Sequence, residues 1–572
     1  MQRLLTNIIR GSLFCGSPFL RIFALLELNT SSMAEEKSLI AAVGNVMLAT
    51  LIFCYLFAAA GLLCGFAISG VILPLAFISA FLSVLRKNPV GKQSLVACCI
   101  ALALLLACIA VAAVSSDFSY DGNFYHQSTV VCLVEGWNPY RDLEAPKELL
   151  LWSVHYAKAL EMISATIMAV TGSLESGKAV NLMLIIATGL VVYGFWHNDL
   201  GRGSKVESTV AAAVAACNPV AVCQSLTFYI DYSKYCYLVL TIVWLVRLCR
   251  GGRNTMEAAV WLLGIVCLAI GTKFNVFFEE GLTLMAAMLW MVWIKDYRNF
   301  FRIGVIGLTG LLVGAFVVGY HPYLTNWITA GHPLFPLFGE GREEIMTGNT
   351  PEIFAGGSRI VKFFVSVTIP AVPGVDSRWG AFGPFFIILL ALAVVTIGSR
   401  WRELRGLIAY IAVCCLASCF FFEQSWWGRY VCQAWFLVPL AMYAAVAGRP
   451  MNRVFWIMAA TSAITIAICA CSTIYSSVRR TLYRNAVCAV LEGERVATVN
   501  LNPAFKRQMA ERGVMAVETG SVTLGSTAFY YYGHDGDDKP MLCLSPRQYE
   551  AVKSAIRRLP FGYNEILNNN LK

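Results

Sequence analysis

The sequence predicts an all-α polytopic membrane protein with a small α/β domain at its C-terminus. Of the 572 residues, 58% are hydrophobic and only 14% are charged, and the mean hydropathy is +0.65. The apolar residues recur in blocks of roughly 20, the length at which a helix crosses a bilayer, and short basic loops separate the blocks. From about residue 477 onward the composition changes to mixed polar and charged, which indicates a separate domain.

The chain divides into three predicted parts. Residues 1–37 form an N-terminal cytoplasmic arm or an over-long start, because Met33 is followed by a sequence that resembles a natural start. Residues 38–476 hold about thirteen apolar blocks, each close to the length of a membrane span. The blocks lie near 40–63, 67–85, 94–114, 178–196, 207–223, 232–249, 256–270, 274–294, 303–319, 382–398, 406–422, 430–447 and 454–472.

Residues 477–572 form the third part, a small extracytoplasmic domain. Its short alternating runs predict strands, including one at 495–499, and a helix is expected at 547–558. We expect this domain to be an accessory module because it is small.

The basic loops predict the orientation. They lie at 86–92, 202–205, 247–253, 295–302, 400–405 and 449–453. All six fall on one side, the cytoplasm, if segment 148–172 does not cross the membrane. That segment contains Glu148, His155, Lys158 and Glu161, which are costly at membrane depth, so it is expected to lie along the surface or to re-enter.

The outer face then holds the long connections 115–177 and 320–381 together with the C-terminal domain. Long connections that exceed what a simple turn needs are where function is expected. The net charge of +10 does not predict a nucleic-acid partner, because the Lys and Arg residues occupy short loops that set orientation. Most cysteines lie inside apolar blocks and no spacing is typical of a zinc site.

The first candidate for chemistry is the acidic and aromatic loop 117–126, directly after the block 94–114. Asp121 lies in Ser-Tyr-Asp-Gly, where glycine permits a tight turn, and Asp117 is the second carboxylate of the loop. A partly desolvated carboxylate at the membrane edge is suited to act as a general base on a hydroxyl, so both residues are candidate catalytic residues. The structural alternative is that they cap an interfacial helix.

Aromatic and polar residues in the outer segments are candidates for binding the substrate. Tryptophan and tyrosine can stack on a sugar ring or lie at the headgroup level. The candidates are Tyr125, His126, Trp137, Asn138, Tyr140, Asp231, Asn326 and Trp327.

Cations at the outer boundary are candidates for binding a lipid-linked phosphate. Lys273 lies at the outer end of an apolar block and Arg429 follows two tryptophans, with His321 and His332 as weaker candidates. The alternatives are that Lys273 snorkels to the interface, that Arg429 anchors the aromatic belt, and that the histidines only bond their loops. No Gly-rich phosphate loop is present, which favours a lipid-linked donor over a nucleotide sugar.

Taken in order, these motifs resemble the GT-C glycosyltransferases, multispanning enzymes that use polyprenyl-phosphate-linked sugars and include protein O-mannosyltransferases and lipid A aminoarabinose transferases. The resemblance covers most of residues 94–447. It depends on Tyr120-Asp121-Gly122 with Tyr125-His126, on Gly136-Trp137-Asn138-Pro139-Tyr140, on Tyr323-Leu324-Thr325-Asn326-Trp327, on the segment 331–336, and on Trp426-Trp427-Gly428-Arg429-Tyr430.

The resemblance implies a GT-C fold with Asp121 as the catalytic base and a polyprenyl-phosphate-linked sugar as the donor. The chain departs from the family at Gly122, where the mannosyltransferases have the Glu of an Asp-Glu pair. This departure leaves open which sugar is used and whether a divalent metal is needed. No cofactor is certain.

The sequence therefore leads us to expect an inverting glycosyltransferase of the bacterial inner membrane with its active site on the extracytoplasmic face. Its acceptor is expected to be a glycan, lipid or protein of the cell envelope. One alternative is a polymerase or ligase of lipid-linked glycans, which needs no carboxylate base at this place. The other is a secondary transporter, which would have inverted repeats and ionisable groups at mid-membrane, whereas the charges here fall at the ends of the blocks.

Overall fold

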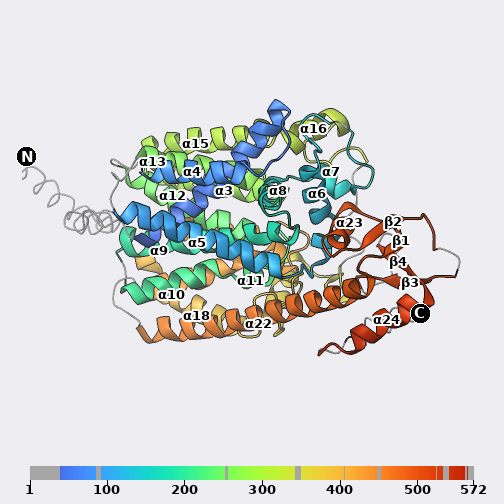
Figure 1. The fold of residues 1–572 in the computed structure, drawn as a ribbon. Helices are drawn as coiled ribbons and strands as arrows, with labels where there is room; N and C mark the ends of the chain where they lie inside the picture. Colours follow the sequence, from blue (N-terminus) through green and yellow to red (C-terminus); the bar gives the residue numbers. More distant parts are fainter. Residues whose placement is uncertain are drawn as a thin grey trace, which may run out of the picture.

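The structure is a computed structural model in which a bundle of long helices carries a small sheet domain at one end (Figure 1). It describes residues 39–85, 92–142, 144–201, 203–251, 255–341, 350–404, 406–446, 452–522, 525–532, 540–560 and 563. The predicted arm 1–37 lies outside these residues. So do Arg86, Lys87, Arg202, Arg253, Arg405 and Arg449 of the predicted basic loops.

Helices make up most of the described chain. Six of those described are long and apolar enough to cross a membrane by length and composition: Leu39–Cys64, Gln93–Val114, Glu175–Asp199, Phe274–Trp293, Tyr297–Phe316 and Arg453–Leu491. These six are compatible with a membrane protein, while the count of thirteen spans stays a prediction.

The helices of the first half are α3 (Leu39–Cys64), α4 (Ile72–Leu85), α5 (Lys92–Val114), η1 (Gly122–His126), α6 (Gln127–Val134), α7 (Leu151–His155), α8 (Ala159–Thr171), η2 (Glu175–Lys178), α9 (Ala179–Gly194), η3 (Phe195–Asp199), α10 (Lys205–Ala216), α11 (Pro219–Gln224), α12 (Ser233–Arg250), α13 (Thr255–Ile270) and α14 (Phe274–Trp293). The second half has α15 (Tyr297–Phe316), α16 (Tyr320–Ala330), η6 (Glu352–Phe354), α17 (Arg359–Thr368), α18 (Phe386–Ser399), α19 (Trp401–Leu404), α20 (Leu407–Ser418), η7 (Gly428–Tyr430), η8 (Cys432–Phe436), α21 (Leu437–Val446) and α22 (Asn452–Leu491).

Each predicted apolar block contains helical structure, but several blocks are not one continuous helix, among them the block 207–223. It is divided into α10 and α11 at Asn218. The Asn218 side chain accepts a hydrogen bond from the backbone N–H of Val220, and Pro219 occupies the first turn of α11. A residue before proline avoids the helical region, so the chain must interrupt the helix here.

The described basic loops lie at one end of the bundle. Arg247 pairs with Asp199 at 2.7 Å, and Arg250 donates to the backbone carbonyl of the same Asp199. Asn299 donates to the carbonyl of Cys249, which brings the start of α15 to the same place. The sheet domain, α7 and α16 lie at the opposite end, which we call the domain end (Figure 1). The predicted separation of basic loops from long connections is therefore present in the fold.

Helix α8 lies across the bundle, and Figure 1 shows it end-on while the long helices run sideways. This agrees with the expectation that 148–172 does not cross with the other helices. Residues 159–168 are all buried inside the protein, and the expectation that the segment lies along the membrane surface or re-enters stays a prediction. Glu161 Oε1 bonds to His126 at 2.7 Å inside the protein, and Lys158 donates to the backbone carbonyls of Val154 and Tyr156, so both charged side chains have partners within the fold.

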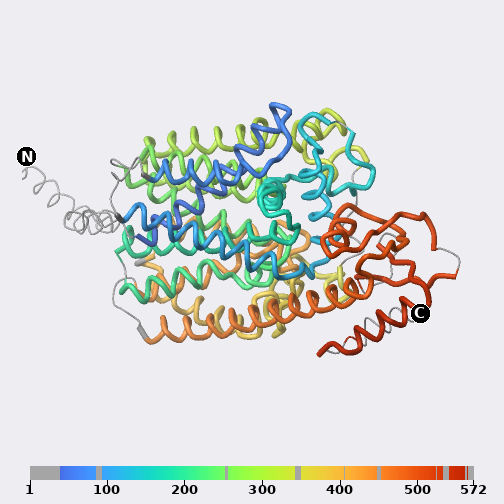
Figure 2. The backbone as a smooth tube through the Cα atoms, in the orientation of Figure 1, coloured from blue at the N-terminus to red at the C-terminus, as the bar shows by residue number. Residues whose placement is uncertain are grey.

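Helix α22 continues to Leu491 and so extends well beyond the predicted apolar block 454–472. Figure 2 shows this helix as one continuous coil that runs from the bundle into the domain. Its last turns, with Tyr483, Val487 and Leu491, form part of the domain's hydrophobic core. The helix continues because its final apolar residues pack against the sheet instead of lipid.

The sheet has the order β2-β1-β4-β3, with β1 parallel to β2 and antiparallel to β4. The predicted strand and helix are confirmed as β1 (Arg495–Val499) and α24 (Pro546–Arg557). The remaining elements are α23 (Pro503–Ala510), β2 (Met515–Glu518), β3 (Thr527–Tyr530) and β4 (Met541–Leu544). Helix α23 packs on α6 and so ties the domain to the loop that carries Asp121.

Candidate active site

Five charged side chains from distant parts of the sequence meet at the domain end. Arg429 Nη1 donates to Asp121 Oδ2 at 2.9 Å and lies 3.6 Å from Asp231 and 3.4 Å from Asp376. Asp231 also pairs with Lys273. We call Asp121, Asp231, Lys273, Asp376 and Arg429 the charged cluster. One arginine in the centre thus holds three carboxylates, and one lysine supplies a second cation.

The charged cluster is open to its surroundings at its ends and closed in its middle. The side chains of Asp121 and Lys273 are each 18% exposed, whereas Arg429 and Asp231 are 8% and 2% exposed. The Asp376 side chain is 31% exposed, so a molecule arriving from outside can reach two carboxylates, Asp121 and Asp376, and one ammonium group. It does not have to open the core of the protein to do so.

Two glycines allow the segments that bear these charges to come together. A Cβ atom at Gly122 would collide with the Asp117 carboxylate and the Ser119 hydroxyl. A Cβ atom at Gly428 would collide with Ala381, in the segment that carries Asp376. The first of these contacts disfavours any side chain at position 122 in this fold.

Aromatic rings surround the central arginine. The Arg429 guanidinium lies 4.3 Å from the centre of the Trp427 ring, 5.1 Å from that of Tyr229 and 5.5 Å from that of Tyr430. The Tyr229 hydroxyl also donates to Asp376 at 3.3 Å. These contacts fix the plane of the guanidinium, so its donors point at the carboxylates.

The electrostatics favour the charged forms. Burial alone would raise the pKa of Asp231, but Lys273 and Arg429 lower it below its ordinary value. Burial would lower the pKa of Arg429, yet Asp121 and Asp231 raise it well above its ordinary value. Burial raises the pKa of Tyr125 well above its ordinary value, and Asp121 adds to this effect.

The structural alternatives for three of these residues are not supported. Asp121 occupies the N-cap position of η1, but its side chain makes no capping hydrogen bond and binds Arg429 instead. Lys273 pairs with Asp231 rather than extending away from the protein. Arg429 is packed among acids and aromatic rings, which is not the position of an interfacial anchor.

A second polar layer lies beneath the cluster. Lys234 Nζ donates to the carbonyl of Tyr430 at 2.6 Å and lies 3.3 Å from Glu279, which also accepts from Gln433. Glu280 is buried next to Glu279. The sequence predicts ionisable groups only at the ends of apolar blocks, which holds for Lys234 at the start of α12 but is wrong for Glu279 and Glu280 of α14. Glu279 is the sixth residue of α14, so at a rise of about 1.5 Å per residue it lies roughly one and a half turns in.

Asp117 lies outside the charged cluster. It is fully buried, and its carboxylate accepts from the backbone N–H of Ser119 at 2.7 Å and of Phe228 at 2.9 Å. Gln127 donates to it as well, at 3.2 Å. Burial raises the pKa of Asp117, with a further contribution from Glu175. Asp117 therefore holds the base of the loop through buried hydrogen bonds, and its catalytic role stays a prediction.

The residues Trp137, Asn138, Tyr140 and His321 form a separate structural group. Asn138 donates to the carbonyl of Leu62 at 2.8 Å, and the Tyr140 hydroxyl donates to the carbonyl of Val318. His321 bonds to Thr325 at 2.8 Å and packs edge-on against Trp137. Burial lowers the pKa of His321 well below its ordinary value, so it is neutral and unsuited to binding a phosphate.

The remaining candidates are divided between the cluster's edge and the outer loop. The His126 ring packs on Tyr125 with ring centres 4.2 Å apart. Asn326 bonds to His155 at 2.8 Å and so closes the loop. His332 accepts from the backbone N–H of Leu334, and Trp327 is 56% exposed. Among the described residues, Asn326, His332 and Trp327 make no contact with the charged cluster.

Asp376, Tyr229 and Tyr430 were not among the predicted site residues. Each has a signal in the sequence: Asp376 lies beside Arg378 and Trp379 in the long connection 320–381, and the two tyrosines are close in sequence to Asp231 and Arg429. Asp121 is a candidate because it is an outer carboxylate close to aromatic residues. The same criterion, applied to every outer carboxylate, also selects Asp376.

Within the described part of the chain, no group of three or more His, Cys, Asp or Glu side chains is placed to hold a metal ion. Comparison with known protein families finds no family that matches this chain, and a search of curated proteins finds no match. The functional interpretation therefore depends on the geometry of the charged cluster.

Proposed function

We propose that this protein is a membrane-embedded, inverting glycosyltransferase that moves a sugar from a polyprenyl phosphate to an acceptor on the extracytoplasmic face. The observation that carries the proposal is the charged cluster. It combines a reachable carboxylate, Asp121, with two cations, Lys273 and Arg429, at the end of a bundle of apolar helices. A base and a phosphate-binding pair are the two elements that such a transfer needs.

The chemistry is a single displacement at the anomeric carbon. The acceptor hydroxyl gives its proton to Asp121 as its oxygen forms a bond to that carbon. The bond from the carbon to the phosphate oxygen breaks, and the electron pair stays on the phosphate. Attack opposite the departing group inverts the anomeric configuration.

Arg429 and Lys273 stabilise the phosphate as its charge develops. In the resting structure Arg429 is shared among Asp121, Asp231 and Asp376, so its donors are held in place before a donor substrate arrives. A phosphate that takes over the Arg429 donor now bound to Asp121 also frees that carboxylate to act as a base. Donor binding and activation of the base are then linked through one guanidinium group.

One observation in the second polar layer favours the transporter alternative, because Glu279 and Glu280 are ionisable groups inside helix α14. Lys234 bonds to the backbone of Tyr430, however, so this layer supports the floor of the charged cluster. A polymerase or ligase of lipid-linked glycans would use the same cations, but it gives no role to a reachable carboxylate.

The test uses the full chain, purified and placed in lipid nanodiscs, with a panel of polyprenyl-phosphate-linked sugars. We expect release of polyprenyl phosphate and a product of inverted anomeric configuration. The Asp121→Asn variant should lose this activity. Glu135→Gln, which changes an exposed carboxylate in the same outer segment, should keep it. If no donor in the panel is turned over, or if Asp121→Asn turns over normally, the proposal fails.

A further inference from the structure

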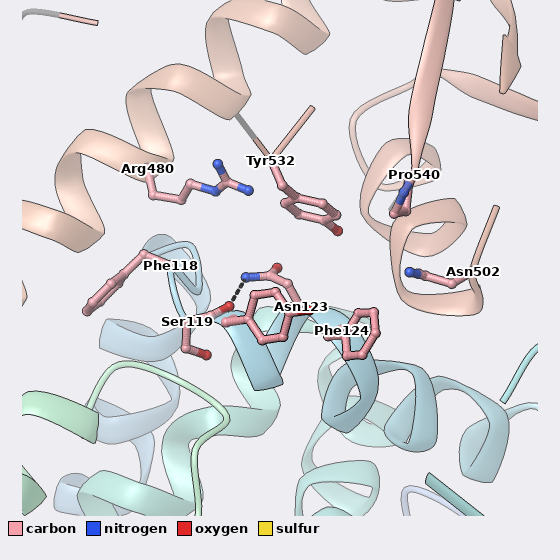
Figure 3. A pocket seen from close by; sticks show the side chains of 9 residues that line it. Phe118, Ser119, Asn123, Phe124, Arg480, Asn502, Tyr532 and Pro540 are labelled. Carbon is pink, nitrogen blue, oxygen red and sulfur yellow. Dashed lines mark hydrogen bonds between the residues drawn. The ribbon is translucent and has the colours of Figure 1, made fainter. Parts of the chain in front are cut away.

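A cavity lies between the loop that carries Asp121 and the C-terminal domain (Figure 3). Its volume is about 110 Å³. It is lined by Phe118, Ser119, Tyr120, Asn123, Phe124, Arg480, Asn502, Tyr532 and Pro540. The lining thus combines four aromatic rings with two amides, one hydroxyl and one cation.

The cation has no carboxylate partner. No ion pair within the described residues involves Arg480, and its Nε is buried without a hydrogen-bond partner. Its nearest aromatic contact is Tyr532, whose ring centre lies 4.9 Å from the guanidinium. Figure 3 shows the Arg480 guanidinium and the Tyr532 ring side by side at the edge of the cavity. A buried charge without a partner is costly, so an anion in this cavity would be stabilised.

The neighbouring charges strengthen this preference. Arg484, one turn further along α22, and Lys178 both pair with the same carboxylate, Glu175, each at 2.5 Å. One carboxylate therefore serves two cations, and none is left for Arg480. Arg512 also lies at this junction, where it donates to Ser116 and to the carbonyl of Gln508.

The cavity and the charged cluster lie on opposite sides of one short segment. Asp121 faces Arg429, whereas Asn123 faces the C-terminal domain and accepts from Arg484 and Gln508. Tyr120 and Phe124, which flank Asp121, have ring centres 5.1 Å apart at the wall of the cavity. A molecule held in the cavity therefore lies next to the segment that positions the proposed base.

We propose that this cavity binds an anionic carbohydrate, a sugar ring that bears a carboxylate or a phosphate. The aromatic rings pack on the faces of the sugar, the amide of Asn502 bonds a hydroxyl, and Arg480 pairs with its charged group. This binding goes beyond the proposed function and does not depend on it.

Direct binding in the absence of donor tests the inference. The probes are galacturonic acid, galactose 6-phosphate and galactose, which differ only at carbon 6, together with inorganic phosphate. The full chain in nanodiscs is titrated with each, and binding is measured by saturation-transfer NMR. We expect at least one charged sugar to bind more tightly than both galactose and inorganic phosphate, and the comparison of carboxylate with phosphate identifies the anion.

Variants locate the site. Arg480→Gln should weaken binding about tenfold to a hundredfold, the effect of losing one charge-assisted hydrogen bond. Tyr532→Ala should also weaken binding, as a second variant that leaves Arg480 in place. Arg479→Gln is the matched control, because it removes the same charge from the adjacent position of α22, which does not line the cavity. It should bind like the wild type.

The inference is overturned if neither charged sugar binds, if inorganic phosphate binds as tightly as both, or if Arg480→Gln and Tyr532→Ala bind like the wild type. Asp121→Asn should retain binding, since Asp121 faces the other side of the segment. If the wild-type protein binds a charged sugar but transfers no sugar from any donor, the proposed function is refuted and this inference stands. Activity without binding of charged sugars would refute only this inference.

Discussion

The contrast between Asp121 and Asp117 is the sharpest consequence of the structure. Both are aspartates of one loop, yet Asp121 is partly exposed and bonded to a cation, whereas Asp117 is buried and bonded to backbone N–H groups. The same substitution should therefore affect two different quantities. Asp121→Asn should lower the rate and Asp117→Asn should lower the stability.

The magnitudes follow from these contacts. Loss of a general base costs about 10²- to 10⁴-fold in rate, which corresponds to roughly 3 to 5 kcal/mol of transition-state stabilisation. Asparagine at 121 keeps an oxygen that can accept from Arg429, so the free energy of unfolding should change by about 1 kcal/mol or less. At position 117 the new amide group would face the N–H groups of Ser119, Phe228 or Gln127, at a cost of about 1 to 3 kcal/mol.

The assay measures both quantities on each purified variant in nanodiscs: the turnover of a polyprenyl-phosphate-linked sugar and the midpoint of thermal unfolding. Asp121→Asn should be inactive with a nearly unchanged midpoint. Asp117→Asn should unfold at a lower temperature and keep most of its turnover per folded molecule. The opposite pattern would mean that Asp117 is the base and that the interpretation of the loop is wrong.

The remaining predictions concern the cations, the orientation and the pH dependence. Lys273→Met and Arg429→Gln should each lower turnover about ten- to a thousandfold, similar to the loss of one oxyanion donor; normal turnover in both would place the phosphate elsewhere. A reporter that is active only in the cytoplasm, fused after Lys572, should be silent, and activity there would place the C-terminal domain on the cytoplasmic side. Because Lys273 and Arg429 lower the folded-state pKa of Asp231, its charge contributes stability above the unfolded-state value of about 4 and loses it as the pH falls toward the folded-state value. Thermal unfolding between about pH 3 and pH 7 should therefore show a smaller acid-induced loss in Asp231→Asn than in the wild type, and equal losses would contradict the assigned pairing.

The sequence alone was sufficient for the local features of the fold. The apolar blocks give the positions of the helices because a run of about 20 apolar residues has few stable alternatives to a helix. The strand at 495–499 and the helix at 546–557 follow from local periodicity and capping, including the capping box between Ser545 and Gln548. Membrane crossing by all the predicted spans and the glycosyltransferase activity stay predictions.

Only the tertiary structure decides which of the predicted residues act together. Asp121, Asp231, Lys273 and Arg429 are separated by long stretches of sequence, and their pairing depends on how α5, α12 and α14 pack at the domain end. No local pattern distinguishes Asp121 from Asp117, since their environments come from Arg429 in one case and from the backbone of Phe228 in the other. Propensity and hydropathy depend on near neighbours along the chain, whereas burial and ion pairing depend on neighbours in space, and helix packing sets those.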